Sequence, residues 1–258
     1  MQPILAATGP SPRAFAVQRR AGALARQMKA PLERFHSDSP FVAARIAERA
    51  QALDAQLVVM GAGAPGGARR LLGLSRAHAV QRRIAAPVLV VQAPRALPYQ
   101  RIVVASDLCA SDAATLAALR ERHPQAALHL VHVYQWHLLR PLRHAFVPED
   151  LMWHYRREAQ AEADAELRRF VAAHGVDRDV RAEAVLGHVA LGLRQRVERL
   201  GADLLVLSPE RSRLKAMVGA SVTQALLADP PCDVLLAPRP QFGVRVAFLR
   251  TRGAAGGL

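Results

Sequence analysis

The chain has 258 residues, 51% of them hydrophobic, which is enough for a buried core and excludes a disordered protein. A formal net charge of +14 ordinarily indicates an anionic partner. However, only Lys29 and Lys215 are lysines, so 33 of the 35 basic residues are arginines, and acidic residues lie between them along segments such as 156–169. This pattern favours solvated helix faces, and we do not expect nucleic acid as a partner.

The two cysteines and the chain start bear on the compartment. Cys109 and Cys232 match neither a disulfide framework nor a metal-ligand spacing, which favours a reducing compartment. Residues 1–14 lack the basic region and long apolar stretch of a signal peptide, and no apolar run reaches the roughly 18 residues of a membrane span. We expect a cytoplasmic protein without membrane contact.

In chain order, the expected elements occur twice. The first is a buried strand that ends in a small hydroxyl residue and precedes a turn and a helix. Later come a helix with apolar residues on one face, which leads into a strand, and then a closing apolar strand. The matching segments are 4–8 with 102–106, 41–60 with 188–207, and 87–91 with 233–237. The chain therefore contains an internal duplication.

The two repeats differ in length. Ile4 and Val58 are 54 positions apart, whereas Ile102 and Leu205 are 103 apart, so the first repeat is 49 residues shorter. The second repeat fills this interval with expected strands near 128–133 and 180–185 and an amphipathic helix over 150–174. The first has only 32–36 there, which leaves room for one short strand at most. We expect this loss to expose apolar surface on the flank of the first repeat unless another segment covers it.

Alternating strands and helices predict the α/β class: two doubly wound, Rossmann-like parallel-sheet domains of strand order 3-2-1-4-5, the first shortened. The predicted boundaries are 1–95, 99–240 and a tail over 241–258. In such sheets ligands bind at the carboxyl ends of strands 1 and 4. Asp107 follows strand 1 of the second repeat, where its carboxylate could bind an adenine amino or ribose hydroxyl group. It could equally cap the helix that follows.

Together these segments resemble the universal stress protein (UspA-like) family. The resemblance runs from residue 1 to about 238, as a tandem member with an adenine nucleotide alpha hydrolase-like fold. In the first repeat it is carried by the glycine-rich segment 61–75 and the closing strand 87–91. In the second repeat it is carried by 104–107, Gly187, 204–207, Ser221-Val222 and 232–236. The resemblance implies that the two closing strands pair or abut.

Nucleotide-binding members use the strand 1 aspartate for adenine and a glycine-rich loop for the phosphates. In the first repeat Gly9 replaces the aspartate, and Ala64 and Leu74 replace two loop glycines, although Gly61 and Ser75 match. In the second repeat Ala220 stands at a glycine position. The candidate ATP site implied for this repeat consists of Asp107, Val133, Ser208, Arg211, Gly219 and Ser221. We expect no tightly bound cofactor, with weak ATP binding by the second repeat left open.

Other chemistry receives no support from the residues. His129 and His132 lie three apart on a strand and so point to opposite faces, and Asp150 and His154 lack a third ligand, so no metal site is predicted. Because no hydrolase, metalloprotease or intact phosphate-loop motif is present, we expect no catalytic residues and no enzyme activity.

The segment 135–155 combines both tryptophans with arginines and apolar residues. It either binds a protein partner or folds back over the chain itself. The leading hypothesis is a non-catalytic, stress-response or regulatory module whose two domains pair with each other, with a homodimer left open. The alternatives are an ATP-binding sensor or weak ATPase that uses the second domain, and a nucleic-acid-binding protein.

Overall fold

The computed structural model describes residues 1–11, 13–38, 42–62, 76–92, 98–134, 149–176, 179–208 and 222–237. The elements of the first repeat are β1 (Ile4–Thr8), α1 (Ala14–Gln27), β2 (Leu32–His36), α2 (Val42–Ala52), β3 (Leu57–Gly61), α4 (Arg76–Gln81) and β4 (Val88–Val91). Those of the second are β5 (Arg101–Ala105), α5 (Ala110–Arg122), β6 (Ala127–Tyr134), α7 (Glu149–His174), β7 (Arg181–Leu186), α8 (Val189–Leu200), β8 (Leu204–Leu207), α9 (Val222–Ala228) and β9 (Asp233–Leu236).

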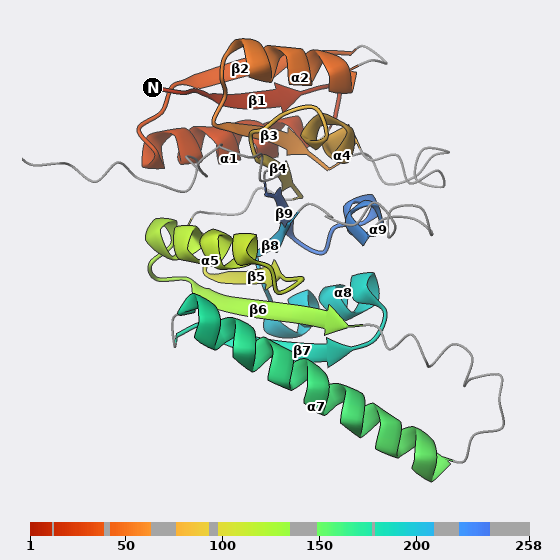
Figure 1. The fold of residues 1–258 in the computed structure, drawn as a ribbon. Helices are drawn as coiled ribbons and strands as arrows, with labels where there is room; N and C mark the ends of the chain where they lie inside the picture. Colours follow the sequence, from red (N-terminus) through yellow and green to blue (C-terminus); the bar gives the residue numbers. More distant parts are fainter. Residues whose placement is uncertain are drawn as a thin grey trace, which may run out of the picture.

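The strands of the described residues form one nine-stranded sheet, in the order β2-β1-β3-β4-β9-β8-β5-β6-β7 (Figure 1). The second repeat has the predicted 3-2-1-4-5 order, and the first has the same order without its outermost strand. Residues 32–36 do form a strand, since Leu32 pairs with Ile4 in parallel. The overall order differs from two separate sheets because β4 pairs with β9 in the antiparallel direction.

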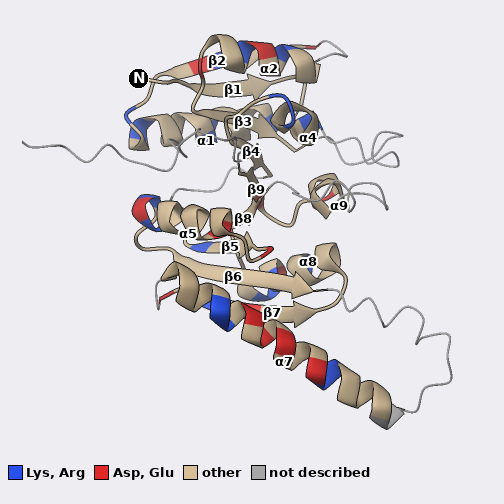
Figure 2. Ribbon diagram, in the orientation of Figure 1, with Lys and Arg blue, Asp and Glu red and all other residues tan. Residues whose placement is uncertain are grey.

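Helix α7 carries charged residues of both signs, with arginines on either side of a group of acidic residues (Figure 2). Several arginines of α8 are bound to carboxylates. Arg196 lies 2.9 Å and Arg199 lies 3.5 Å from Glu183, and Arg194 lies 3.2 Å from Asp229. These three arginines thus have carboxylates beside them.

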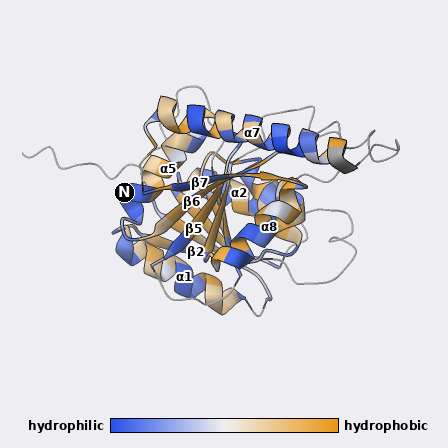
Figure 3. Ribbon diagram, turned by 90° about the horizontal axis from the view of Figure 1, so that it is seen from below, coloured by the Kyte–Doolittle hydropathy of each residue, from blue (hydrophilic) through white to orange (hydrophobic). Residues whose placement is uncertain are grey.

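Two apolar layers cover the two faces of the sheet. One face is covered by α2, α4, α8 and α9, and the other by α1, α5 and α7 (Figure 1). The middle strands are largely apolar on both sides, as expected for a parallel sheet buried between helices (Figure 3). Within the described residues, no helix is both long and apolar enough to cross a membrane.

The seam between the repeats contains a buried ion pair. Arg20 of α1 lies 3.0 Å from Asp233 of β9, and both side chains are 1% exposed. Asp233 also accepts hydrogen bonds from the backbone N–H of Gln92, at 2.9 Å, and the hydroxyl of Tyr99, at 3.0 Å. Burial, followed by the nearby Asp233 charge, holds the pKa of Tyr99 well above its usual value. The phenol therefore stays protonated and keeps donating to the carboxylate.

The flank of the first repeat has an open groove with an apolar lining and a charged rim. The missing strand and helix leave a groove between α1 and β2 whose rim carries the exposed side chains of Arg19, Arg26, Lys29 and Arg34. Leu32 and small residues of α1 form the apolar part of its lining. The flank thus combines the expected apolar surface with a rim of positive charge.

Candidate functional site

The ligand crevice of the second repeat contains a buried carboxylate, that of Asp112, at the carboxyl ends of β5 and β8. Its Oδ2 accepts hydrogen bonds from the Ser106 hydroxyl at 2.8 Å and from the backbone N–H groups of Asp107 and Cys109 at 3.1 and 3.2 Å. Its Oδ1 accepts from the Ser208 hydroxyl at 2.8 Å. The residue is 0% exposed, so these four donors satisfy its charge in place of water.

Local sequence explains how this carboxylate reaches the crevice. Leu108 adopts a left-handed backbone with φ 57°, which turns the chain sharply after β5. Helix α5 then begins after Cys109, and Asp112 at its third position forms a capping box with that residue. The alternative interpretation of Asp107 as the helix cap is therefore wrong. The Asp107 side chain is exposed at the end of β5.

The structure describes three of the six predicted nucleotide-site residues. Asp107 and Ser208 both donate hydrogen bonds to the carboxylate of Asp112. Asp107 donates from its backbone N–H, and Ser208 donates from its hydroxyl. Val133, near the end of β6, is 7% exposed and packs against α8, where a Cβ on Gly192 would lie 3.1 Å from it. Arg211, Gly219 and Ser221 lie outside the described residues.

This arrangement has a clear electrostatic consequence for anionic ligands. Phosphate binding at the crevice needs N–H and O–H donors that are free to point at the phosphate, and a nearby carboxylate repels the phosphate unless a cation lies between them. In this repeat the donors around Ser106 and Ser208 already point at Asp112. A phosphate group that approached them would have to displace this carboxylate or share donors with it, at the cost of repulsion between like charges.

The crevice of the first repeat is crossed by a cation. Arg13, just before α1, donates from Nη1 to the backbone carbonyl of Ala62, just after β3, at 2.9 Å. Its Cβ would be 3.3 Å from a Cβ placed on Gly61, so the glycine leaves room for this side chain. Gly9 follows β1 where nucleotide-binding members have a carboxylate. Ala64, Leu74 and Ser75, which the sequence comparison placed in the phosphate loop, lie outside the described residues.

A hydroxyl, an imidazole and a carboxylate also follow one another at the ends of β1 and β2. Thr8 Oγ1 lies 3.3 Å from His36 Nδ1, and His36 Nε2 lies 3.1 Å from Asp38 Oδ1. Hydrolases use a similar series, but there the carboxylate is buried. Here the His36 and Asp38 side chains are 61% and 69% exposed, so water screens the pair.

Sequence reasoning missed both residues that occupy the crevices. Asp112 was detectable, because an acidic residue three positions after a helix cap is the sequence signature of a capping box. Arg13 carried no comparable signal, because its partner Ala62 is 49 positions away. For metals, no three His, Cys, Asp or Glu side chains converge within the parts of the chain that the structure describes.

Comparisons with known proteins agree with the duplicated fold. A family model described as the universal stress protein family matches residues 33–92 and 98–238. A functionally unknown protein from Pseudomonas aeruginosa is similar at a TM-score of 0.59 and 16% identity, over 91% of this chain and 81% of that one. A universal stress protein from Archaeoglobus fulgidus is similar at 0.58 and 14%, over 92% of this chain and 96% of that one.

These identities show a shared fold and nothing finer. No protein with a curated description matches the sequence. The family model, in contrast, matches once in each repeat, and the two matches together cover most of the chain. The chain belongs to the universal stress protein family, as a tandem member whose first repeat is shortened.

Proposed function

We propose that this chain is a non-catalytic regulatory module of the stress response and that neither of its repeats binds ATP strongly. The observation that carries the proposal is the buried Asp112, which holds four donors at the crevice of the second repeat. In the first repeat, Arg13 spans the corresponding crevice and Gly9 supplies no side chain to bind adenine. Family membership supports the stress-response role, and the occupied crevices support the weakness of ATP binding.

Calorimetric titration with Mg-ATP tests the binding part of this proposal. The full chain should give no saturable heat up to about 1 mM ligand, which corresponds to a binding free energy weaker than about −4 kcal/mol. Saturation in the low micromolar range would contradict it. The variant Asp112→Asn keeps the shape of the side chain and removes its charge. A gain of affinity in this variant would identify the carboxylate as the block.

A second candidate function, ATP sensing by the second repeat, is favoured by one observation. Asp107 remains exposed at the carboxyl end of β5, where it could accept hydrogen bonds from an adenine amino or ribose hydroxyl group. If titration detects ATP, Asp107→Asn should weaken the binding at least tenfold, because it removes the charged acceptor. The matched control is Asp179→Asn, at the start of the bend before β7.

The non-catalytic part of the proposal is tested at Thr8 and His36. Their exposed arrangement suggests an ester hydrolase, but a screened imidazole without a buried carboxylate lacks the stabilisation that hydrolases use. Hydrolysis of an activated ester such as p-nitrophenyl acetate should proceed at the same rate in the wild type and in Thr8→Val. A wild-type rate that Thr8→Val reduces more than tenfold would show a nucleophilic hydroxyl.

A further inference from the structure

The groove between α1 and β2 lies in a position that a helix fills in the second repeat. In that repeat α7 packs beside α5 on the same face of the sheet, with Leu167 and Phe170 buried in the shared apolar layer. The first repeat has α1 and β2 in the places of α5 and β6, and the described helix that follows them, α2, covers the opposite face. The groove has a volume of about 480 Å³, which lies within the size range of small-molecule sites.

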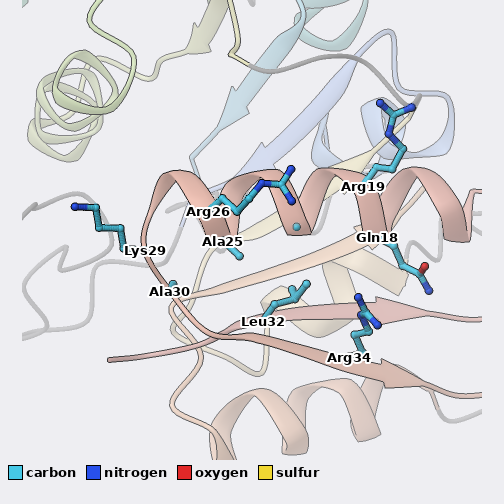
Figure 4. A pocket seen from close by; sticks show the side chains of 9 residues that line it. Gln18, Arg19, Ala25, Arg26, Lys29, Ala30, Leu32 and Arg34 are labelled. Carbon is cyan, nitrogen blue, oxygen red and sulfur yellow. The ribbon is translucent and has the colours of Figure 1, made fainter.

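The groove is surrounded by positive charge. Its cations are Arg19 and Arg26 of α1, Lys29 just beyond that helix, and Arg34 of β2 (Figure 4). All four side chains belong to exposed residues, and none of the nine residues that line the groove is acidic. Water therefore reaches all four cations, and an anionic ligand can reach them as well.

The acidic residue that is nearest in sequence points away from the groove. Glu33 stands between Leu32 and Arg34 on β2, so its side chain lies on the opposite face of the sheet. There its carboxylate lies 3.6 Å from Arg49 of α2. Within the described part of the chain, the four groove cations form no ion pair with a carboxylate, in contrast to the arginines of α8. Their charge is therefore free to act on a ligand.

The cations lie towards both ends of the groove, which favours a ligand with several linked charges. Arg19 and Arg26 are seven residues apart in one helix, or about 10 Å along its axis. Figure 4 shows Lys29 at one end of the groove and Arg34, with the amide of Gln18, at the other. A single phosphate or carboxylate group can contact only one end. An anion whose charges are spread along a chain can accept charge-assisted hydrogen bonds at both ends.

The lining narrows the class of anion further. Leu32 is the one large apolar side chain among the nine lining residues, so an acidic helix would bury little apolar surface here. None of the nine is aromatic, whereas single-stranded nucleic acids stack their bases on aromatic side chains. Gly22 and Ala25 are small and let a narrow chain approach α1 closely. The planar guanidinium groups of the arginines match the oxygens of phosphate.

We propose that the groove between α1 and β2 binds a linear condensed phosphate, which runs along α1 between Arg34 and Lys29. Such a chain has a high density of charge and no apolar surface, in keeping with the lining. The groove lies on a face of the sheet, away from both crevices, so this site does not depend on whether either repeat binds ATP. Mg-ATP is a poor ligand for it, because Mg²⁺ takes up phosphate oxygens and offsets their charge.

Calorimetric titration of the full chain with inorganic tripolyphosphate, without magnesium and in about 50 mM salt, tests the proposal. We expect saturable binding with a Kd of about 10 µM, and at least tenfold weaker binding of orthophosphate. The double variant Arg26→Gln/Arg34→Gln should bind tripolyphosphate at least tenfold more weakly. The matched control Arg156→Gln/Arg168→Gln removes the same charge from exposed positions of α7 and should bind as the wild type does. Circular dichroism checks that each variant is folded.

Four results would overturn the proposal. They are the absence of saturable heat up to about 1 mM tripolyphosphate, equal affinities for tripolyphosphate and orthophosphate, full binding by the folded groove variant, and a change of affinity in Asp112→Asn, which would place the ligand in the crevice. A glutamate-only peptide and vesicles with anionic lipid are titrated in parallel. If either binds more tightly than tripolyphosphate and the groove variant loses that binding, the groove serves an acidic protein segment or a membrane surface instead.

Discussion

The two crevices of this molecule are occupied by side chains of opposite charge. In the first repeat the guanidinium of Arg13 spans the strand ends and donates a hydrogen bond to the carbonyl of Ala62. In the second repeat the carboxylate of Asp112 gathers donors from two strand ends and a helix start. Two repeats of one fold have thus filled the same position in different ways. Asp112 is fully buried, whereas Arg13 is partly exposed. The two side chains should therefore contribute differently to the free energy of unfolding.

The largest loss of unfolding free energy is expected at the seam, where Arg20 and Asp233 form a buried ion pair. In Asp233→Ala, Arg20 becomes a buried charge without a counterion, which costs about 3–5 kcal/mol in the free energy of unfolding. Arg20→Met should cost much less, because Asp233 retains its bonds from Tyr99 and Gln92. Urea unfolding of both variants checks this order. Equal losses would mean that the two charges contribute only as a pair.

Removing the carboxylate from the second crevice should have the next largest effect. Asp112→Ala leaves two hydroxyls and two backbone N–H groups without their acceptor, and we expect a loss of about 3 kcal/mol in unfolding free energy. The control is Asp107→Ala, since that side chain is exposed. Similar stabilities for these two variants would refute a central role for Asp112 in organising the strand ends.

In the first crevice, Arg13→Ala should cost about 1 kcal/mol, because the side chain is partly exposed and water can take over the hydrogen bond to Ala62. Arg13→Lys is the informative companion, since it keeps the charge but lacks the planar group that reaches Ala62. The same urea measurement applies. A loss as large as that of Asp112→Ala would mean that the two crevices are equally important for stability.

The smallest expected effect is on pH dependence. Burial, followed by the charge of Arg122, lowers the pKa of His123, whose ring meets Tyr99 near the seam at 5.7 Å between centroids. The unfolded chain then binds more protons below the ordinary histidine pKa, so stability falls as the pH falls through about 6.5. In His123→Gln, the melting temperature should therefore fall less between pH 7 and pH 5 than in the wild type. The difference measures how much His123 contributes to the pH dependence. Burial lowers the pKa of His129 as well, so some dependence should remain.

Local patterns were sufficient for most of the fold. Apolar runs and helical spacing predicted the strands and the 149–174 helix, because burial on both faces leaves a strong signal in a parallel sheet. They did not predict the charged groove, although Arg19 and Arg26 lie seven residues apart on one face of α1. Such spacing identifies the residues that share a helix face. Only the structure shows that this face borders the position where the second repeat carries α7 and the first repeat has no helix. For the same reason, Arg13 could not be placed before the strand order was known.

The antiparallel pairing of β4 with β9 has a consequence for how the repeats can change. A protein made of a single such unit would present its closing strand as an open edge, and its association would depend on concentration. Here both edges belong to one chain, so they meet at a fixed ratio of one to one and dilution cannot separate them. The shortened flank lies at the edge of the sheet, at β2, whereas this joint lies in the middle. The first repeat could therefore lose a strand without disturbing the joint.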